Sequence, residues 1–243
     1  MIAVKDLRKV YGKTVAVSSV SFVAPNGQVT GLLGPNGAGK TTVLRTLTGL
    51  VKPERGHAVV DGCDVRQHPL AARGRLGVLP EQVGLYDRLT VREHLMYSGE
   101  LRDLADPDLG RAVDLMLGRL ALAAIATRPA GELSLGQRRR VALASALVHN
   151  PSNVVLDEPT NGLDVLSARE VRRVVRDLAA SGCAVVLSSH VMPEVSAVCD
   201  RIVVLSRGLV VASGTPAEIL AQTDASVLEE AFVRLIGSEE GLN

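Results

Sequence analysis

The sequence predicts an α/β protein with a mainly parallel β-sheet. Short runs rich in β-branched residues alternate along the 243 residues with segments whose apolar residues recur at helical spacing. A glycine-rich loop at residues 34–41 stands between one such run and one such helix. Hydrophobic residues make up 47% of the chain but aromatic residues only 2%, so the core must consist of valine, leucine, isoleucine and alanine.

The first part of the chain is rich in expected strands. Residues 1–23 alternate in the manner of strands, and Asn26-Gly27 is a turn signal. Further short strands are expected at residues 28–33, 58–60 and 76–79. Apolar residues recur at helical spacing from Val43 to Val51, and Pro53 ends that helix. Asp61-Gly62 marks another turn.

The second half opens with a long helical stretch. From about residue 85 to residue 127 the pattern is helical without a clear strand, which predicts an inserted helical subdomain. Strands are expected at residues 154–156 and 184–187, and a hairpin at residues 202–205 and 209–212. Thr215 and Glu218 have capping-box spacing, and a final helix is expected over residues 227–236.

The distribution of charge argues against a nucleic-acid-binding protein. The chain has 27 basic and 26 acidic side chains and a net charge of +1. It therefore lacks the excess of basic residues that is typical of nucleic-acid-binding proteins. Arg138–Arg140 is the strongest counter-argument, and we interpret it as a solvated helix face or a local anion contact. The arginines of residues 169–176 lie opposite Val171 and Leu178 on a helical pattern, and we interpret them as another solvated face.

Cysteine content and hydropathy indicate a cytoplasmic chain. The three cysteines are odd in number and lack metal-ligand spacing, which is typical of reduced, buried thiols. No apolar run reaches the ~18 residues of a membrane helix, and the longest candidate, residues 115–126, is interrupted by Arg119. Ile2 and Val4 fit a strand better than a signal peptide, so any membrane role must come through a partner.

The strongest motif is the glycine-rich loop, which matches the phosphate-binding pattern in full. Its residues are Gly34, Pro35, Asn36, Gly37, Ala38, Gly39, Lys40 and Thr41. Glycines let the backbone N–H groups turn inward around a phosphate, and the helix N-terminus adds partial positive charge. We expect Lys40 to bridge the β- and γ-phosphates and Thr41 to bind Mg²⁺.

Two carboxylates follow a later apolar strand, at Asp157 and Glu158. Acids often end strands as simple solvated caps, but behind a full phosphate loop they indicate metal binding and catalysis. We expect Asp157 to bind the metal held by Thr41, and Glu158 to polarise the attacking water.

The segment Leu133–Gln137 precedes a helix that is expected to run to about His149. Ser134 and Gln137 have capping-box spacing, so one interpretation is a simple helix cap. The other is a phosphate grip, because a capped helix N-terminus beside Gly136 attracts anions.

In combination these motifs resemble the ATP-binding subunits of ABC transporters, and the resemblance covers essentially the whole chain. Leu133–Gln137 is similar to the family's signature motif. The glutamine loop, aspartate loop, switch histidine and adenine-stacking aromatic of the family correspond in order to Gln82, Gly162–Asp164, His190 and Tyr11. The signature usually has glycine in its third place, where this chain has Leu135, but Ser134 and Gly136 are intact.

The resemblance implies a P-loop NTPase (RecA-like) core with an antiparallel β subdomain and an inserted helical subdomain. The implied divisions of this single domain are a core of residues 1–84 and 149–214, a helical subdomain of residues 85–148 and an extension of residues 215–243. It implies ATP and Mg²⁺ as ligands, with Gln82 both catalytic and metal-binding and His190 catalytic. The implied nucleotide contacts further include Thr42, Ser134, Gly136, Gln137 and Asp164.

The implied partners are a second copy in a head-to-tail dimer and an integral-membrane permease, with no nucleic acid. The chain would then work on the cytoplasmic face of the plasma membrane. Residues 85–101, 188–204 and 228–236 are most similar to bacterial exporters of the sodium-extrusion or drug-efflux type. The alternatives are a soluble ABC ATPase without a permease and a nucleotide-responsive module that does not hydrolyse ATP.

Overall fold

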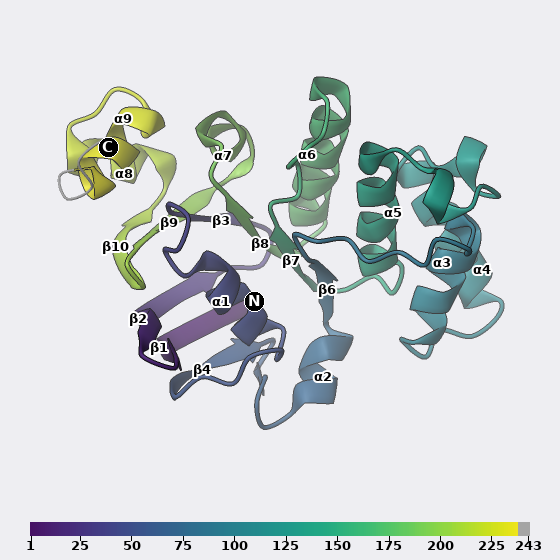
Figure 1. Ribbon diagram of the computed structural model, residues 1–243, viewed down its shortest axis with the longest axis horizontal. Helices are drawn as coiled ribbons and strands as arrows, with labels where there is room; N and C mark the ends of the chain where they lie inside the picture. Colours follow the sequence, from purple (N-terminus) through teal and green to yellow (C-terminus); the bar gives the residue numbers. More distant parts are fainter. Residues whose placement is uncertain (238–243) are drawn as a thin grey trace.

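The computed structural model describes residues 1–237, and within them ten strands form one sheet. The strands are β1 (Ile2–Tyr11), β2 (Thr14–Ala24), β3 (Val29–Leu33), β4 (Arg55–Val60), β5 (Cys63–Asp64), β6 (Leu76–Leu79), β7 (Asn153–Asp157), β8 (Ala184–Ser189), β9 (Arg201–Ser206) and β10 (Leu209–Gly214). They lie in the order β5-β4-β1-β2-β10-β9-β3-β8-β7-β6 (Figure 1). The predicted α/β class is confirmed.

Helices flank this sheet and connect its strands. They are α1 (Lys40–Leu47), α2 (Pro69–Gly74), α3 (Val91–Glu100), α4 (Asp108–Arg119), α5 (Leu135–Leu147), α6 (Val165–Ala180), α7 (Met192–Val198), α8 (Pro216–Thr223) and α9 (Leu228–Ile236), with short 3-10 helices η1 (Ala123–Ile125) and η2 (Ala130–Glu132). The helices α3 and α4 pack against each other and α3 against α5, beside the β6 end of the sheet (Figure 1).

The parallel part of the sheet determines where the functional loops lie. Strand β3 pairs in parallel with β8 and β9, and β7 pairs in parallel with β8 and β6. Every residue of β3, β7 and β8 is buried, which explains why these strands are mainly apolar in the sequence. Because parallel strands end at one edge of a sheet, the loops that follow them meet there.

The antiparallel part consists of β1, β2, β4 and β5. Ile2 of β1 lies opposite Ala24 of β2 on one side and Val60 of β4 on the other. A single parallel pairing of Leu209 with Ser19 joins this part to β10. The register of the β1–β2 pair shifts between Val4 and Val10, so the ladder is irregular over this stretch.

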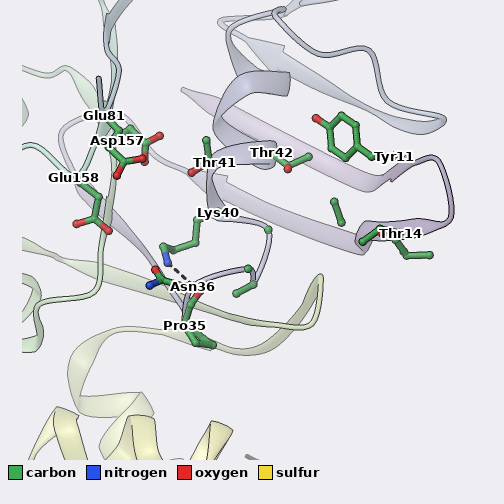
Figure 2. A pocket seen from close by; sticks show the side chains of 15 residues that line it. Tyr11, Thr14, Pro35, Asn36, Lys40, Thr41, Thr42, Glu81, Asp157 and Glu158 are labelled. Carbon is green, nitrogen blue, oxygen red and sulfur yellow. Dashed lines mark hydrogen bonds between the residues drawn. The ribbon is translucent and has the colours of Figure 1, made fainter. Parts of the chain in front are cut away.

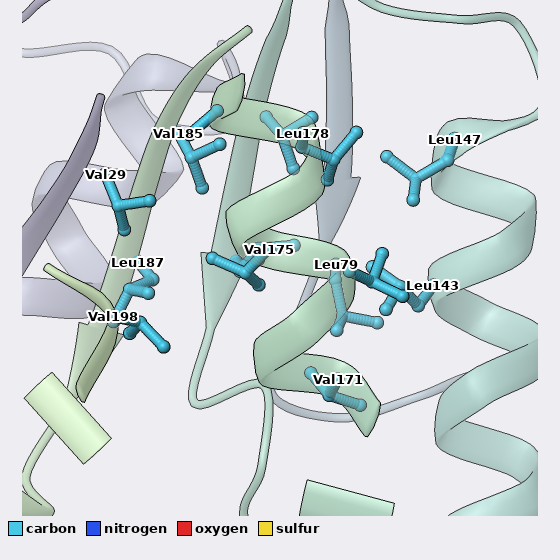
Figure 3. Close-up of a cluster of buried hydrophobic side chains, with 14 of the residues drawn as sticks. Val29, Leu79, Leu143, Leu147, Val171, Val175, Leu178, Val185, Leu187 and Val198 are labelled. Atoms are coloured by element: carbon cyan, nitrogen blue, oxygen red, sulfur yellow. The ribbon is translucent and has the colours of Figure 1, made fainter. Parts of the chain in front are cut away.

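One core cluster lies between the parallel strands and the helices that cover them. Val171, Val175 and Leu178 of α6 pack with Val185 and Leu187 of β8 in this cluster (Figure 3). Burying each such side chain contributes ~1.5–3 kcal/mol. The opposite face of α6 is largely exposed, as predicted for its arginines.

Several element boundaries differ from the sequence-based expectation. Helix α1 ends at Leu47, before Val51, because Gly49 adopts a left-handed φ of 70° and exposes Leu50. The short helices α2 and α7 were not expected. Helices α8 and α9 lie in the expected C-terminal extension, whose residues 238–243 are outside the described part of the chain.

Two further expectations concern the cysteines and the membrane. The three cysteines are free, and Cys183 and Cys199 are buried. Burial raises the pKa of the Cys183 thiol to about 11 and that of Cys199 to about 12, so both stay protonated and unreactive. Over residues 1–237, no helix combines the length and the apolar character that crossing a membrane requires.

Candidate active site

The glycine-rich loop joins the end of β3 to the start of α1, and its backbone path requires glycine. Gly39 precedes α1 with a left-handed φ of 104°, and a Cβ atom there would lie 2.6 Å from the Ala16 carbonyl oxygen. A Cβ atom on Gly34 would lie 2.5 Å from the Leu205 carbonyl oxygen. Side chains at these positions would displace neighbouring backbone, so the loop conformation depends on both residues.

Lys40 is the first residue of α1, and its ammonium group is buried at the mouth of this loop. Its Nζ donates hydrogen bonds to the carbonyl oxygens of Gly34, at 2.6 Å, and Pro35, at 3.1 Å. Burial lowers the pKa of Lys40, and the charges of Glu158, Asp157 and Glu81 oppose that shift. The only cation of the loop therefore faces three carboxylates.

A cavity of about 370 Å³ opens beside the loop (Figure 2). Its lining comes from four regions of the chain: Tyr11, Thr14, Val15, Ala16, residues 35–42, Glu81, Asp157 and Glu158. Figure 2 shows Tyr11 on one side of the loop and the carboxylates on the other. The Tyr11 ring is 45% exposed, and the Lys9 ammonium lies 5.1 Å from its centroid.

The carboxylates at the end of β7 are held by β8, its neighbour in the sheet. Ser188 donates a hydrogen bond of 2.5 Å from its hydroxyl to Asp157 Oδ1, and its hydroxyl accepts one of 3.0 Å from the Glu158 amide. Glu158 has a left-handed φ of 49°, and its Oε1 lies 2.9 Å from His190 Nδ1. The pairing of β7 with β8 thus brings Asp157, Glu158 and His190 together beside Thr41.

Comparison with known proteins shows which family this chain belongs to. The model of the family described as "ABC transporter" matches residues 17–161, which include the phosphate loop, Asp157 and Glu158. The chain belongs to the ABC transporter family. The matched residues carry the nucleotide-binding motifs of that family.

Individual ABC transporter relatives agree with this assignment. The chain is 36% identical to the probable multidrug ABC transporter ATP-binding protein YbhF of Escherichia coli, over 97% of this chain but only 42% of YbhF. It is 38% identical to NatA of Bacillus subtilis, over 82% of this chain and 81% of NatA. The chain therefore spans less than half the length of YbhF and most of that of NatA.

Solved ABC structures show the same fold. An ATP-binding subunit of an ABC transporter superposes with a TM-score of 0.90 at 30% identity, covering 97% of this chain and 99% of that one. The cassette MJ0796, solved as a dimer in a post-hydrolysis state with ADP and phosphate, has a TM-score of 0.81 at 25% identity, over 88% of this chain and 98% of that one.

Sequence reasoning singled out Gln82 as the residue of the ABC glutamine loop, but it missed Glu81. Glu81 lines the cavity of the phosphate loop. Gln82 lines a neighbouring cavity of about 270 Å³, together with Thr41 and Asp157. Because β6 lies next to β7, the first polar residue after β6 faces the same site as Asp157, and this adjacency is the signal that identifies Glu81.

The ABC signature segment is the N-terminus of α5. Ser134 and Gln137 form the predicted capping box: the Ser134 hydroxyl accepts a hydrogen bond from the Gln137 amide, and Gln137 Oε1 accepts one from the Ser134 amide. Ser134, Gly136 and Gln137 do not line the cavity of their own phosphate loop. Leu135 is 59% exposed.

Residues 162–164, which resemble the aspartate loop of the family, pack beside this segment. Asp164 caps α6 by accepting a 2.9 Å hydrogen bond from the Ser167 amide. A Cβ atom on Gly162 would lie 2.8 Å from Leu135 Cδ2, so Leu135 fills the space that this glycine leaves. Asp164 also lies outside the lining of the phosphate-loop cavity.

Of the two interpretations of Arg138–Arg140, a solvated helix face or a local anion contact, neither describes the middle residue. Arg138 pairs with Asp87 at 2.9 Å, and Arg140 pairs with Glu170 at 3.2 Å. Arg139, in contrast, is buried and donates hydrogen bonds to backbone carbonyl groups beside the active site. The three consecutive arginines point in different directions because they are about 100° apart around a helix.

Proposed function

We propose that two copies of this chain bind head to tail and hydrolyse ATP between them. Each ATP lies between the phosphate loop of one copy and the signature segment of the other. The observation that carries this proposal is the separation of two half-sites within one chain: the cavity of the phosphate loop is not lined by Ser134, Gly136 or Gln137. A second copy supplies the missing residues.

ATP is held mainly by the loop itself. The backbone N–H groups of residues 36–42, the N-terminus of α1 and the Lys40 ammonium surround the phosphates. Tyr11 stacks on the adenine, and its exposed position on the cavity lining supports this role. In the partner, Ser134 and Gly136 contact the γ-phosphate, with Gln137 and Asp164 close to it.

Thr41 and Asp157 would hold Mg²⁺. Both line the cavity and offer oxygen atoms, the donors that Mg²⁺ prefers. In residues 1–237, no group of three or more histidine, cysteine or acidic side chains could hold a metal alone. Such a sparse set fits Mg²⁺, which keeps several waters and takes further ligands from phosphates. When bound, Mg²⁺ supplies positive charge to the phosphate oxygens.

Hydrolysis uses Glu158 as the base that orients the attacking water and accepts its proton. His190 holds the Glu158 carboxylate in position through the 2.9 Å contact. Glu81 lines both cavities beside Asp157, and Gln82 lines one of them. We assign the role expected of Gln82 alone to this pair of residues. Lys40 stabilises the charge on the leaving phosphates.

The membrane partner is a separate integral-membrane permease, which this chain binds on the cytoplasmic face of the membrane. Residues 85–148 form the helical subdomain that passes motion from the core, residues 1–84 and 149–214, to this permease. Within residues 215–237, the extension packs on the core, with α8 against β9 and β10 and α9 against α7. Export is the favoured direction, because relatives are named for multidrug transport and for lipopolysaccharide export.

The decisive experiment is the Glu158→Gln variant. Glutamine keeps the size of the side chain but cannot accept a proton, so hydrolysis should fall by about 100-fold or more while ATP still binds. Loss of one negative charge near the phosphates should also favour closure of the dimer around ATP. We expect the variant to elute as a dimer with ATP and Mg²⁺ in gel filtration, and the wild type mainly as a monomer.

Two further variants make this experiment specific. Glu229→Gln neutralises an exposed carboxylate on α9, away from both half-sites, and should behave like the wild type. Ser134→Arg, added to Glu158→Gln, should abolish the dimer because a bulky cation blocks the partner's phosphate. Hydrolysis at the wild-type rate by Glu158→Gln would refute its catalytic role. If the double variant still forms a dimer, Ser134 only caps α5 and does not contact the partner's phosphate.

The two alternatives predict different results. A soluble ABC ATPase would not co-purify with a polytopic membrane protein, and a nucleotide-responsive module would release no phosphate from ATP. The contact between Glu158 and His190 favours hydrolysis.

A further inference from the structure

Arg139 of α5 is only 4% exposed, and its guanidinium group donates hydrogen bonds to backbone carbonyl oxygens of two loops. Its Nη1 donates to Glu81 at 2.5 Å, its Nη2 to Asp157 at 2.9 Å and also to Glu158, and its Nε to Pro159 at 3.2 Å. The first carbonyl belongs to the loop after β6, and the other three to the end of β7 and the loop that follows. One side chain therefore joins α5 to both segments that carry the acids of the site.

The choice of acceptors matters for catalysis. These four bonds go to carbonyl groups, so they fix the backbone at Glu81, Asp157 and Glu158 while their carboxylates remain available to the cavity. The planar fork of arginine presents five N–H donors in a fixed arrangement. A lysine ammonium in the same place has one nitrogen atom and cannot reach both loops in this geometry.

Burying a guanidinium group away from water is unfavourable unless its charge is compensated. Burial lowers the pKa of Arg139, and the negative charges of Asp157, Glu81 and Glu158 oppose that shift. The acids of the site therefore stabilise Arg139, and Arg139 in turn offsets part of their mutual repulsion. The neighbouring arginines of α5 have different partners, because Arg138 and Arg140 form ion pairs with acids outside the site.

We propose that Arg139 is a positioning residue for ATP hydrolysis. It holds the loop after β6 and the end of β7 against α5, the helix whose N-terminus is the signature segment. A shift of that segment then moves the backbone of Glu81 and Glu158 directly, through hydrogen bonds within one chain. This inference rests on the catalytic role proposed above for Glu158.

The test compares Arg139→Gln and Arg139→Lys with Arg138→Gln, a matched control on the same helix whose side chain pairs with Asp87 instead. Arg139 donates none of these bonds to the phosphate loop, so its loss should affect turnover rather than binding. We expect Arg139→Gln to lower kcat by about tenfold or more, because small displacements of catalytic groups are costly. KM for ATP, and the affinity for ADP by calorimetry, should stay within about threefold of the wild-type values.

Arg139→Lys should retain an intermediate kcat, since it keeps the charge but not the geometry, and Arg138→Gln should match the wild type. Equal kcat values for Arg139→Gln and Arg138→Gln would overturn the proposal. So would a loss of ADP affinity as large as the loss of kcat, or a failure of both Arg139 variants to fold, since either shows a general structural role. Glu158→Gln is measured in parallel: if it stays active, the proposed function fails. If it is inactive while Arg139→Gln is fully active, only this inference fails.

Discussion

Tyr11 is an exposed side chain, so its effect on ATP binding can be measured without loss of stability. Its ring is backed by the Lys9 ammonium, which Glu54 holds at 2.8 Å. Tyr11→Ala should weaken ATP binding by ~1–3 kcal/mol, the value of one base stacked on an aromatic ring. Calorimetry measures this loss, which should be smaller than that of Lys40→Ala.

Tyr11→Phe is the matched control for this prediction, because it keeps the ring and should keep the affinity. The melting temperature of Tyr11→Ala should stay close to that of the wild type, since the ring is 45% exposed. A collapse of the melting temperature would instead identify Tyr11 as a core residue.

Side chains inside a continuous motif could be predicted from the sequence, whereas those brought together by the sheet could not. Lys40 and Asp157 stand in local patterns whose geometry hardly depends on distant residues. Glu81 and Arg139 have no local pattern, since their position depends on which strand lies beside β7 and how α5 packs on both. Gln82, the neighbour of Glu81, could be named from the sequence only through its resemblance to the family's glutamine loop, and it lines the adjoining cavity with Thr41 and Asp157.

The C-terminal end of α5 makes the stability of the fold depend on pH. His149 Nε2 lies 3.2 Å from the Leu76 carbonyl oxygen, and burial, assisted by the charge of Arg102, lowers the pKa of His149 from 6.5 to about 4. Between these two pH values the unfolded chain binds a proton at this histidine that the folded chain does not. Its contribution to stability is therefore present above pH 6.5 and is lost as the pH falls towards 4.

We expect His149→Gln to make stability less dependent on pH, because glutamine still donates to Leu76 but does not titrate. Urea unfolding at pH 7 and pH 5 measures the change, and the decrease in midpoint should be larger for wild type than for His149→Gln. His57→Gln, at an exposed position, should follow the wild type. Identical decreases in all three proteins would contradict the assignment.

Helices and strands were predictable in proportion to their length and burial. The buried strands β3, β7 and β8 appear in the sequence as apolar runs, and the capping boxes at Ser134 and Thr215 mark true helix starts. The helices α2 and α7 have six and seven residues, too few turns for an apolar period to be visible. Tertiary contacts stabilise such short helices.

The sheet order explains why residues distant in sequence form one site. From β9 towards the edge, β3, β8, β7 and β6 are consecutive neighbours, and the phosphate loop, His190, Glu158 and Glu81 follow them in the same spatial order. The signature segment belongs to α5, beyond this row, so the separation of the two half-sites follows from the topology of the chain. No local sequence pattern encodes that separation.

Two inactive chains should therefore complement each other. Lys40→Ala removes the phosphate half-site and Ser134→Arg the signature half-site, so each homodimer contains only defective sites. In a mixed dimer, one site combines the intact phosphate loop of one chain with the intact signature of the other. Mixing the two proteins should restore phosphate release, whereas doubling the concentration of either one should not. Persistent inactivity of the mixture would refute the composite site.

The left-handed backbone of Glu158, with φ at 49°, has an evolutionary consequence. A side chain in such a conformation costs about 1–3 kcal/mol, and glycine or asparagine tolerates it better. Folding and turnover therefore select for different residues at this position. Laboratory evolution for heat resistance alone should replace Glu158 early, and the thermostable descendants would have lost their catalyst. Selection for growth that depends on transport would keep the glutamate, and stability would then increase through substitutions at other positions.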